Sequence, residues 1–163
     1  MESLLSHFDA DGASRMVDVT SKPVTVRMAD AGARVRMLPE TLRVIRERGV
    51  AKGDVLEVAR LAGIMAAKRT ADLIPLSHPL ALEAVEIAFA FPDADSLEIR
   101  AKVRMEGKTG VEMEALVAVS AAALTVYDMC KSVDRGMIIE QIRLEEKSGG
   151  RSGHFQRQDK REA

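Results

Sequence analysis

The chain has 163 residues, of which 47% are hydrophobic, so it is long enough to bury one sizeable core. Its 24 basic and 25 acidic residues give a formal net charge of -1, which provides no general attraction to nucleic acid or to anionic membranes. The 3% aromatic content argues against a base-stacking surface, and the single cysteine excludes an internal disulfide and fits a reducing compartment. We therefore expect a cytoplasmic protein with neither a nucleic-acid nor a membrane partner.

Two apolar stretches, Met16–Val19 and Val24–Met37, are the first predicted elements. Their two-residue alternation is typical of β-strands, and Gly32 is expected to mark a bend or a bulge in the second. A short helix is predicted at Pro39–Arg48, because proline is favoured at the first helical position and Gly49 is a common helix end.

A second helix is predicted to begin at Asp54. Asp54 and Glu57 have the spacing of a capping box, and the residues that follow are good helix formers as far as Arg69. Two prolines then prevent the helix from continuing, which leaves residues 74–80 as a constrained loop around His78.

The next segments predict an antiparallel hairpin followed by a buried helix. Residues 85–91 and 97–105 alternate between apolar and other side chains on either side of a turn sequence. Thr109 and Glu112 have the spacing of a second capping box, and the helix that they would open is apolar nearly all round as far as Lys131.

The end of the chain adds one strand at residues 138–144 and a polar segment from residue 147 onward. From Ala33, the order is strand, helical segment, strand, strand, helix, strand, which predicts a split βαβ arrangement. We therefore expect an α+β, ferredoxin-like fold with an antiparallel sheet and helices on one face. The expected organisation is one domain over residues 1–153 and a mobile polar tail over residues 154–163.

Four segments of the chain resemble one known family. Residues 16–29, 52–80, 107–131 and 147–153 are similar to the molybdenum cofactor biosynthesis protein C family of cyclic pyranopterin monophosphate synthases. In this chain they read MVDVTSKPVTVRMA, KGDVLEVARLAGIMAAKRTADLIPLSHPL, GKTGVEMEALVAVSAAALTVYDMCK and KSGGRSG. The resemblance extends over nearly the whole chain, and matches of this length are highly specific.

The resemblance implies a lyase that converts 3',8-cyclo-7,8-dihydro-GTP into cyclic pyranopterin monophosphate and pyrophosphate. It also implies a ferredoxin-like subunit that assembles as a homohexamer, a trimer of dimers. One departure is Ser77, which stands where the family often has cysteine, so a cysteine role at that place is in doubt. The implied binding and catalytic positions are Arg27, Lys52, Lys68, His78, Glu112, Glu114, Asp128 and Lys131.

Asp128 and Lys131 are the candidate catalytic pair. Their three-residue spacing places them on one helix face, although an ordinary surface ion pair explains that spacing equally well. Asp128, however, is expected in the last helical turn, where the helix dipole disfavours a carboxylate. An acid at this unfavourable place suggests a function, and the catalytic role of Lys131 follows mainly from the resemblance.

The two glutamates at the other end of this helix are candidate substrate-binding residues with structural alternatives. The capping box gives Glu112 a structural role. Glu114 can equally be a solvated carboxylate that the helix dipole favours in the first turn. Glu114 and Asp128 lie about 20 Å apart along one helix, too far to touch one reacting centre. Either these acids serve different ends of the substrate or, as we prefer, one pocket takes Asp128 from one chain and the glutamates from another.

The remaining site candidates are Arg27, Lys52 and Lys68 as triphosphate clamps and His78 as a proton shuttle or phosphate ligand. A single lysine on a helix is usually solvated, and His78 is equally explained as a histidine hydrogen-bonded within a rigid loop.

The sequence offers no dedicated metal or redox site. The GKTG segment fails as a P-loop, because the pattern requires glycine where Lys102 stands, and the three histidines lack the spacing of zinc ligands. We expect no required cofactor, although Mg²⁺ can accompany the triphosphate. Two other classes stay open from the sequence: a non-catalytic nucleotide-binding module that regulates a partner, and a purely structural oligomer subunit.

Overall fold

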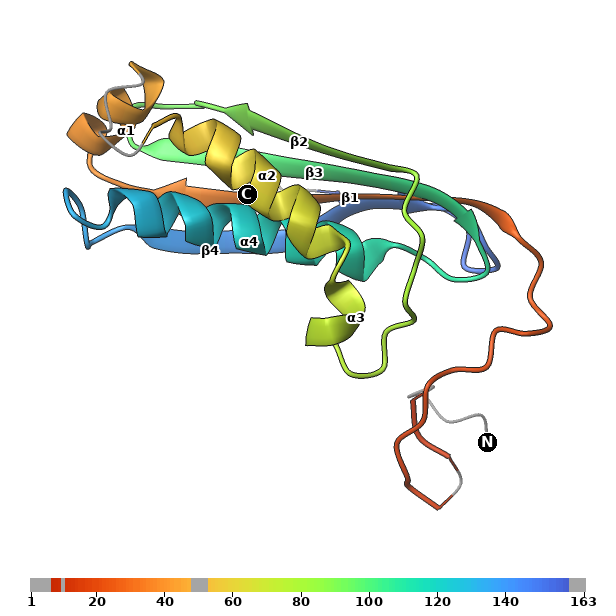
Figure 1. Ribbon diagram of the computed structural model, residues 1–163. Helices are drawn as coiled ribbons and strands as arrows, with labels where there is room; N and C mark the ends of the chain where they lie inside the picture. Colours follow the sequence, from red (N-terminus) through yellow and green to blue (C-terminus); the bar gives the residue numbers. More distant parts are fainter. Residues whose placement is uncertain (1–6, 10, 48–52, 159–163) are drawn as a thin grey trace.

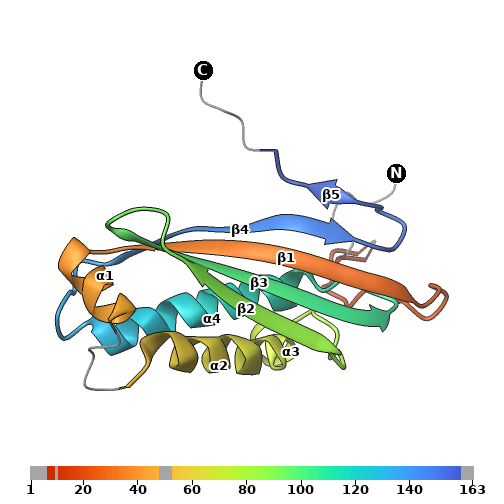
Figure 2. The same ribbon diagram turned by 90° about the horizontal axis from the view of Figure 1, so that it is seen from above.

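The computed structural model describes residues 7–9, 11–47 and 53–158, which form one antiparallel sheet with helices on one face (Figures 1 and 2). The strand order across the sheet is β2-β3-β1-β4-β5. The order of β1 to β4 along the chain and across the sheet is that of a split βαβ unit, so the predicted α+β, ferredoxin-like fold is confirmed. The strands are β1 (Thr25–Arg36), β2 (Ala84–Ala90), β3 (Ser96–Gly107), β4 (Ile138–Ser148) and β5 (Phe155–Gln156).

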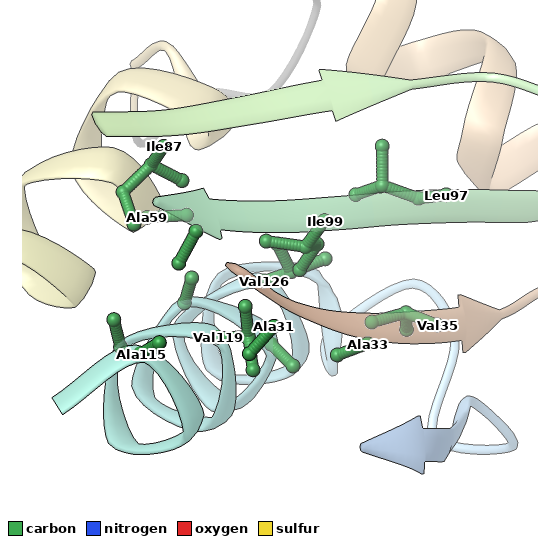
Figure 3. Close-up of a cluster of buried hydrophobic side chains, with 14 of the residues drawn as sticks. Ala31, Ala33, Val35, Ala59, Ile87, Leu97, Ile99, Ala115, Val119 and Val126 are labelled. Atoms are coloured by element: carbon green, nitrogen blue, oxygen red, sulfur yellow. The ribbon is translucent and has the colours of Figure 1, made fainter. Parts of the chain in front are cut away.

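The core lies between the sheet and the long helix α4, with α2 beside it. Every second residue of β1 from Ala29 to Val35, and of β3 from Leu97 to Met105, is buried beneath these helices (Figure 3). Small residues along α4, such as Ala115 and Ala122, are fully buried against them, which allows a close approach of helix and sheet. The helices are α1 (Pro39–Arg46), α2 (Val55–Ala67), α3 (Thr70–Leu73) and α4 (Glu112–Cys130).

Among the described residues, α4 is the one helix that is long and apolar enough to cross a membrane. Its buried residues face the sheet and α2, and nine of its residues are buried in a single chain. This packing is that of a core helix in a globular domain.

Two local signals are confirmed at atomic detail. The Asp54 carboxylate accepts hydrogen bonds from the backbone N–H groups of Leu56 and Glu57, at 3.0 and 3.2 Å, and so caps α2. The pairing of β1 with β4 shifts register on either side of Gly32, which is the bulge that this glycine indicated.

Two predicted elements are wrong. Residues 16–19 form no strand, because no neighbouring strand pairs with them, and β1 begins only at Thr25. The capping box at Thr109 is also absent: α4 begins at Glu112, with Val111 as an N-cap that makes no side-chain capping bond. Val111 is fully buried, so core packing fixes the start of this helix.

The segment after β4 is more ordered than a polar tail. Gly149 and Gly150 adopt φ values of 97° and 73°, which a tight turn requires and which glycine tolerates. The chain then returns as β5, where Phe155 and Gln156 pair with Lys147 and Glu146 of β4. Within the described part of the expected tail, β5 therefore adds a two-residue strand to the edge of the sheet (Figure 2).

Candidate functional site

Asp128 and Lys131, the expected catalytic pair, meet at the C-terminal end of α4. Lys131 Nζ donates a hydrogen bond to Asp128 Oδ1 at 2.6 Å, as their spacing predicts. Within the single chain, the Asp128 side chain is 64% exposed and the Lys131 side chain is 52% exposed. An ion pair this exposed adds at most about 1 kcal/mol to stability. A molecule outside its own subunit can therefore reach the pair.

The other end of α4 borders a hollow of about 610 Å³, which we name the acidic cavity. Glu112, Glu114 and His78 line it together with apolar side chains of the 74–80 loop. The N-terminal segment forms another wall, through Val17, Val19 and Lys22 among others. This volume suits a small-molecule ligand, and the structure brings three expected binding residues into it.

Glu114 is the most perturbed acid of the acidic cavity. Its side chain lies in the first turn of α4, yet the residue is only 2% exposed, so the interpretation as a solvated carboxylate is wrong. Burial raises the pKa of Glu114 to about 7, and the nearby charge of Glu112 adds to this rise. A carboxyl with this pKa exchanges protons near neutral pH, as an acid or base catalyst must.

His78 is held by the N-terminal segment that crosses the acidic cavity. Its Nε2 lies 2.8 Å from the carbonyl oxygen of Val17. Because a carbonyl oxygen can only accept, Nε2 carries a proton, which leaves Nδ1 as the acceptor in the neutral ring. The histidine is therefore oriented by a hydrogen bond to the N-terminal segment and not by one within its own loop, and it lies on the cavity wall.

A second hollow of about 480 Å³ adjoins the acidic cavity, and we name it the basic cavity. The two share Lys22, Thr109, Gly110 and Glu112 as lining residues, so they form one continuous depression. The cationic side chains of the basic cavity are those of Lys22, Arg27, Lys108 and Arg151. Four cations lining one hollow provide the charge that a triphosphate requires.

Arg27 is fixed at the base of the basic cavity. Its side chain is buried, and Nε donates to the carbonyl oxygen of Gly107 at 3.1 Å. The glycine turn after β4 packs directly on it, since a Cβ atom on Gly150 would overlap Arg27 Nη1. A glycine at this position therefore lets the backbone approach the guanidinium closely.

The structure does not bring every expected residue to these cavities. Lys68 is exposed at the C-terminal end of α2 and is not among the residues that line them. Lys52 lies outside the described residues. Within the described part of the chain, no group of three or more His, Cys, Asp or Glu side chains is placed to hold a metal ion.

Sequence reasoning missed three cations of the basic cavity: Lys22, Lys108 and Arg151. Lys108 belongs to the GKTG segment, which does not match the P-loop pattern, so the sequence offered no reason to expect a phosphate contact there. Arg151 belongs to the KSGGRSG segment that we expected to begin a tail. The usable signal was the adjacent pair Gly149 and Gly150, which indicates a tight turn and not a linker.

The fold and the joined cavities define a class: an α+β, ferredoxin-like domain that can hold a phosphorylated small molecule against a buried acid. Comparison with known proteins narrows this class. The sequence model of the MoaC family matches residues 16–150, and the chain belongs to this family. A relative from Mycobacterium bovis (strain ATCC BAA-935 / AF2122/97), named cyclic pyranopterin monophosphate synthase 3, is 58% identical over 158 residues, which cover 97% of this chain and 89% of the relative.

Proposed function

We propose that this protein is a cyclic pyranopterin monophosphate synthase of molybdenum cofactor biosynthesis. It would convert 3',8-cyclo-7,8-dihydro-GTP into cyclic pyranopterin monophosphate with release of pyrophosphate. Membership of the MoaC family and the name of the 58% identical relative support this activity. The observation that carries the proposal is the continuous depression in which a buried Glu114 and four cations meet.

The basic cavity would hold the triphosphate. Arg27 offers a planar, bidentate donor, and the lysines act as point charges on the phosphate oxygens. When a ribose hydroxyl attacks the α-phosphorus, the bond to the β-phosphate oxygen breaks and pyrophosphate leaves with that electron pair. The surrounding cations stabilise the charge that gathers on the leaving group. Lys68 would have to contribute from outside these two cavities, and Lys52 stays a proposed binding cation.

The acidic cavity would hold the purine end of the substrate. Opening the imidazole ring requires a proton on a leaving nitrogen, and the protonated form of Glu114 can donate one near neutral pH. Glu112 and His78 would bind the same part of the substrate from the facing walls. The overall reaction is a rearrangement in which no electrons are gained or lost, so we propose no required cofactor, with Mg²⁺ as a companion of the triphosphate.

Asp128 and Lys131 would complete the site from a neighbouring subunit. They lie about 20 Å along α4 from Glu114, so one chain cannot bring both ends of the helix to one reacting centre. Exposed apolar side chains on α2, at Val58, Leu61 and Met65, support burial of this surface by another chain. We propose on this basis that the chains assemble with active sites at their interfaces, as the homohexamer that the family resemblance implies, and that the enzyme works in the cytoplasm.

Mixing two inactive variants tests the shared site. In a symmetric interface that contains Asp128 of one chain and Glu114 of the other, a mixed pair of Asp128→Ala and Glu114→Gln subunits has one intact site and one doubly altered site. Random exchange should then restore about a quarter of the sites, measured as turnover after co-refolding. Self-mixing of each variant is the control. Absence of recovery despite exchange demonstrated by mass spectrometry would contradict the shared site.

Gly150→Ala tests the basic cavity. The new methyl group would displace the Arg27 guanidinium, so we expect the KM for the substrate to rise about tenfold, equivalent to about 1.4 kcal/mol, with little change in kcat. Gly153→Ala is the matched control, because Gly153 also has a positive φ, of 65°, but has open space around its Cβ position. Equal effects of the two substitutions would mean that backbone strain, and not Arg27, is responsible.

The activity itself is tested by incubating the purified protein with the cyclised GTP, with and without EDTA. We expect a pterin product and an equal amount of pyrophosphate. A nucleotide-binding regulatory module would bind the substrate without forming product, and a structural subunit would do neither. Either result would refute the proposed activity.

A further inference from the structure

The loop that follows α4 carries Lys131 at its start and is largely exposed. Its own backbone closes the end of the helix: the N–H groups of Val133 and Asp134 donate to the carbonyl oxygen of Cys130, at 2.9 and 3.0 Å. The position of the Asp128–Lys131 pair therefore depends on the position of this turn. Both side chains of the pair are more than half exposed, so packing in the core does not hold them.

Asp134 is the buried anchor of this loop. The residue is 5% exposed, and its Oδ1 accepts from the Gly136 N–H at 2.9 Å. Its Oδ2 accepts from the Leu38 N–H at 2.8 Å and from the Thr41 hydroxyl at 3.3 Å. These last two partners lie more than 90 residues away along the chain, at the start of α1.

The start of α1 lacks a cap of its own. Leu38 is the N-cap residue, and its side chain makes no capping hydrogen bond. The Asp134 carboxylate supplies the missing acceptor from a segment far away along the chain, in the place where a helix N-terminus favours a negative charge. The loop after α4 and the first turn of α1 are thus fastened to each other through one side chain.

We propose that Asp134 is a positioning residue for the Asp128–Lys131 pair. Its carboxylate holds the turn that presents Lys131, and so fixes the geometry of the pair toward a substrate bound by a neighbouring subunit. The inference rests on the proposed function and adds to it a residue that does not touch the substrate. A misplacement of about 1 Å in a catalytic group can cost about 10²-fold in rate, so an anchor of this kind has a measurable effect.

Asp134→Asn tests the proposal with little change in volume. In either orientation, the amide NH₂ faces a backbone N–H group that donated to the carboxylate, either that of Leu38 or that of Gly136. Two donors cannot bond to each other, so one of these two hydrogen bonds is lost. We expect kcat to fall by about 10- to 100-fold, while the KM for the cyclised GTP changes by less than about threefold, because the triphosphate contacts are elsewhere.

Two control variants separate positioning from stability. Val103→Ala removes core packing in β3, so it should lower the melting temperature and leave kcat unchanged. Thr41→Val removes only the 3.3 Å hydrogen bond to Asp134, and we expect kcat to fall by about threefold with an unchanged KM. If Asp134→Asn does not fold, Thr41→Val carries the test, and an unchanged kcat in this variant overturns the proposal.

The unsubstituted protein and Lys131→Ala, measured in the same assay, show which claim fails. No product from the unsubstituted protein refutes the proposed function, and full activity of Lys131→Ala refutes the catalytic role of the pair. A kcat within about twofold of normal in folded Asp134→Asn, alongside an inactive Lys131→Ala, overturns only the positioning role of Asp134.

Discussion

Lys131→Ala and Asp128→Ala should each fold normally and lose product formation by about 10²- to 10⁴-fold, the usual contribution of a positioned acid or base. The pair is exposed, so its removal costs at most about 1 kcal/mol of stability. A loss of kcat with an unchanged melting temperature would therefore reflect chemistry and not folding. Turnover is measured as pyrophosphate release, and stability by thermal denaturation.

The control for this prediction is another exposed ion pair within a helix. Arg43 and Glu47 lie four residues apart on α1, with side chains 66% and 62% exposed. Arg43→Ala removes this pair and should change neither kcat nor the melting temperature by a measurable amount. Near-normal turnover in Lys131→Ala or Asp128→Ala would contradict the proposed catalytic role.

Glu114→Gln should reduce kcat by about 10²-fold or more, because glutamine keeps the shape and a hydrogen-bond donor but cannot release a proton. Since the pKa of Glu114 is raised to about 7, the protonated donor is lost as pH rises through neutrality. We expect kcat/KM of the unsubstituted protein to fall above about pH 7, and this inflection to be absent in Glu114→Gln. An unchanged inflection in the variant would assign it to another group.

Glu114 also leads to a prediction for the pH dependence of stability. Its pKa in the folded state lies above its ordinary value of 4.5, so between these two pH values the folded state binds more protons than the unfolded state. The free energy of unfolding should therefore decrease as pH rises from 4.5 to about 7, by at most about 3 kcal/mol, and level off above that. Glu114→Gln should remove this decrease and be the more stable protein above pH 7, as urea denaturation at several pH values would show.

Much of the fold was predictable, because its signals are local. The alternation of apolar residues in β1, β2 and β3 has a period of two, and each strand forms where that alternation is longest. One face of α4 is buried, as its composition predicted, although Leu124 of the same helix is 61% exposed in the single chain. The predicted cap at Thr109 and the predicted strand at residues 16–19 are wrong because local patterns do not determine tertiary contacts. Burial of Val111 fixes the start of α4, and residues 16–19 have no neighbouring strand to pair with in the described part of the chain.

The site was less predictable, because its parts come from separate segments. Lys22, Arg27, Lys108 and Arg151 meet only after β1, β3 and the glycine turn are in place. The burial of Glu114 likewise depends on the 74–80 loop and on the N-terminal segment that crosses the cavity. Spacing alone correctly placed Lys131 against Asp128, since both belong to one helix end.

The central claim is that one substrate lies between the joined cavities of one subunit and the Asp128–Lys131 pair of another. A crystal structure of Asp128→Ala with bound 3',8-cyclo-7,8-dihydro-GTP tests it most directly. We predict the triphosphate against Arg27 and Arg151, the purine beside Glu114, and Lys131 of a neighbouring subunit within hydrogen-bonding distance of the substrate. A substrate bound away from these cavities, or bound in them with every Lys131 facing solvent, would contradict the account.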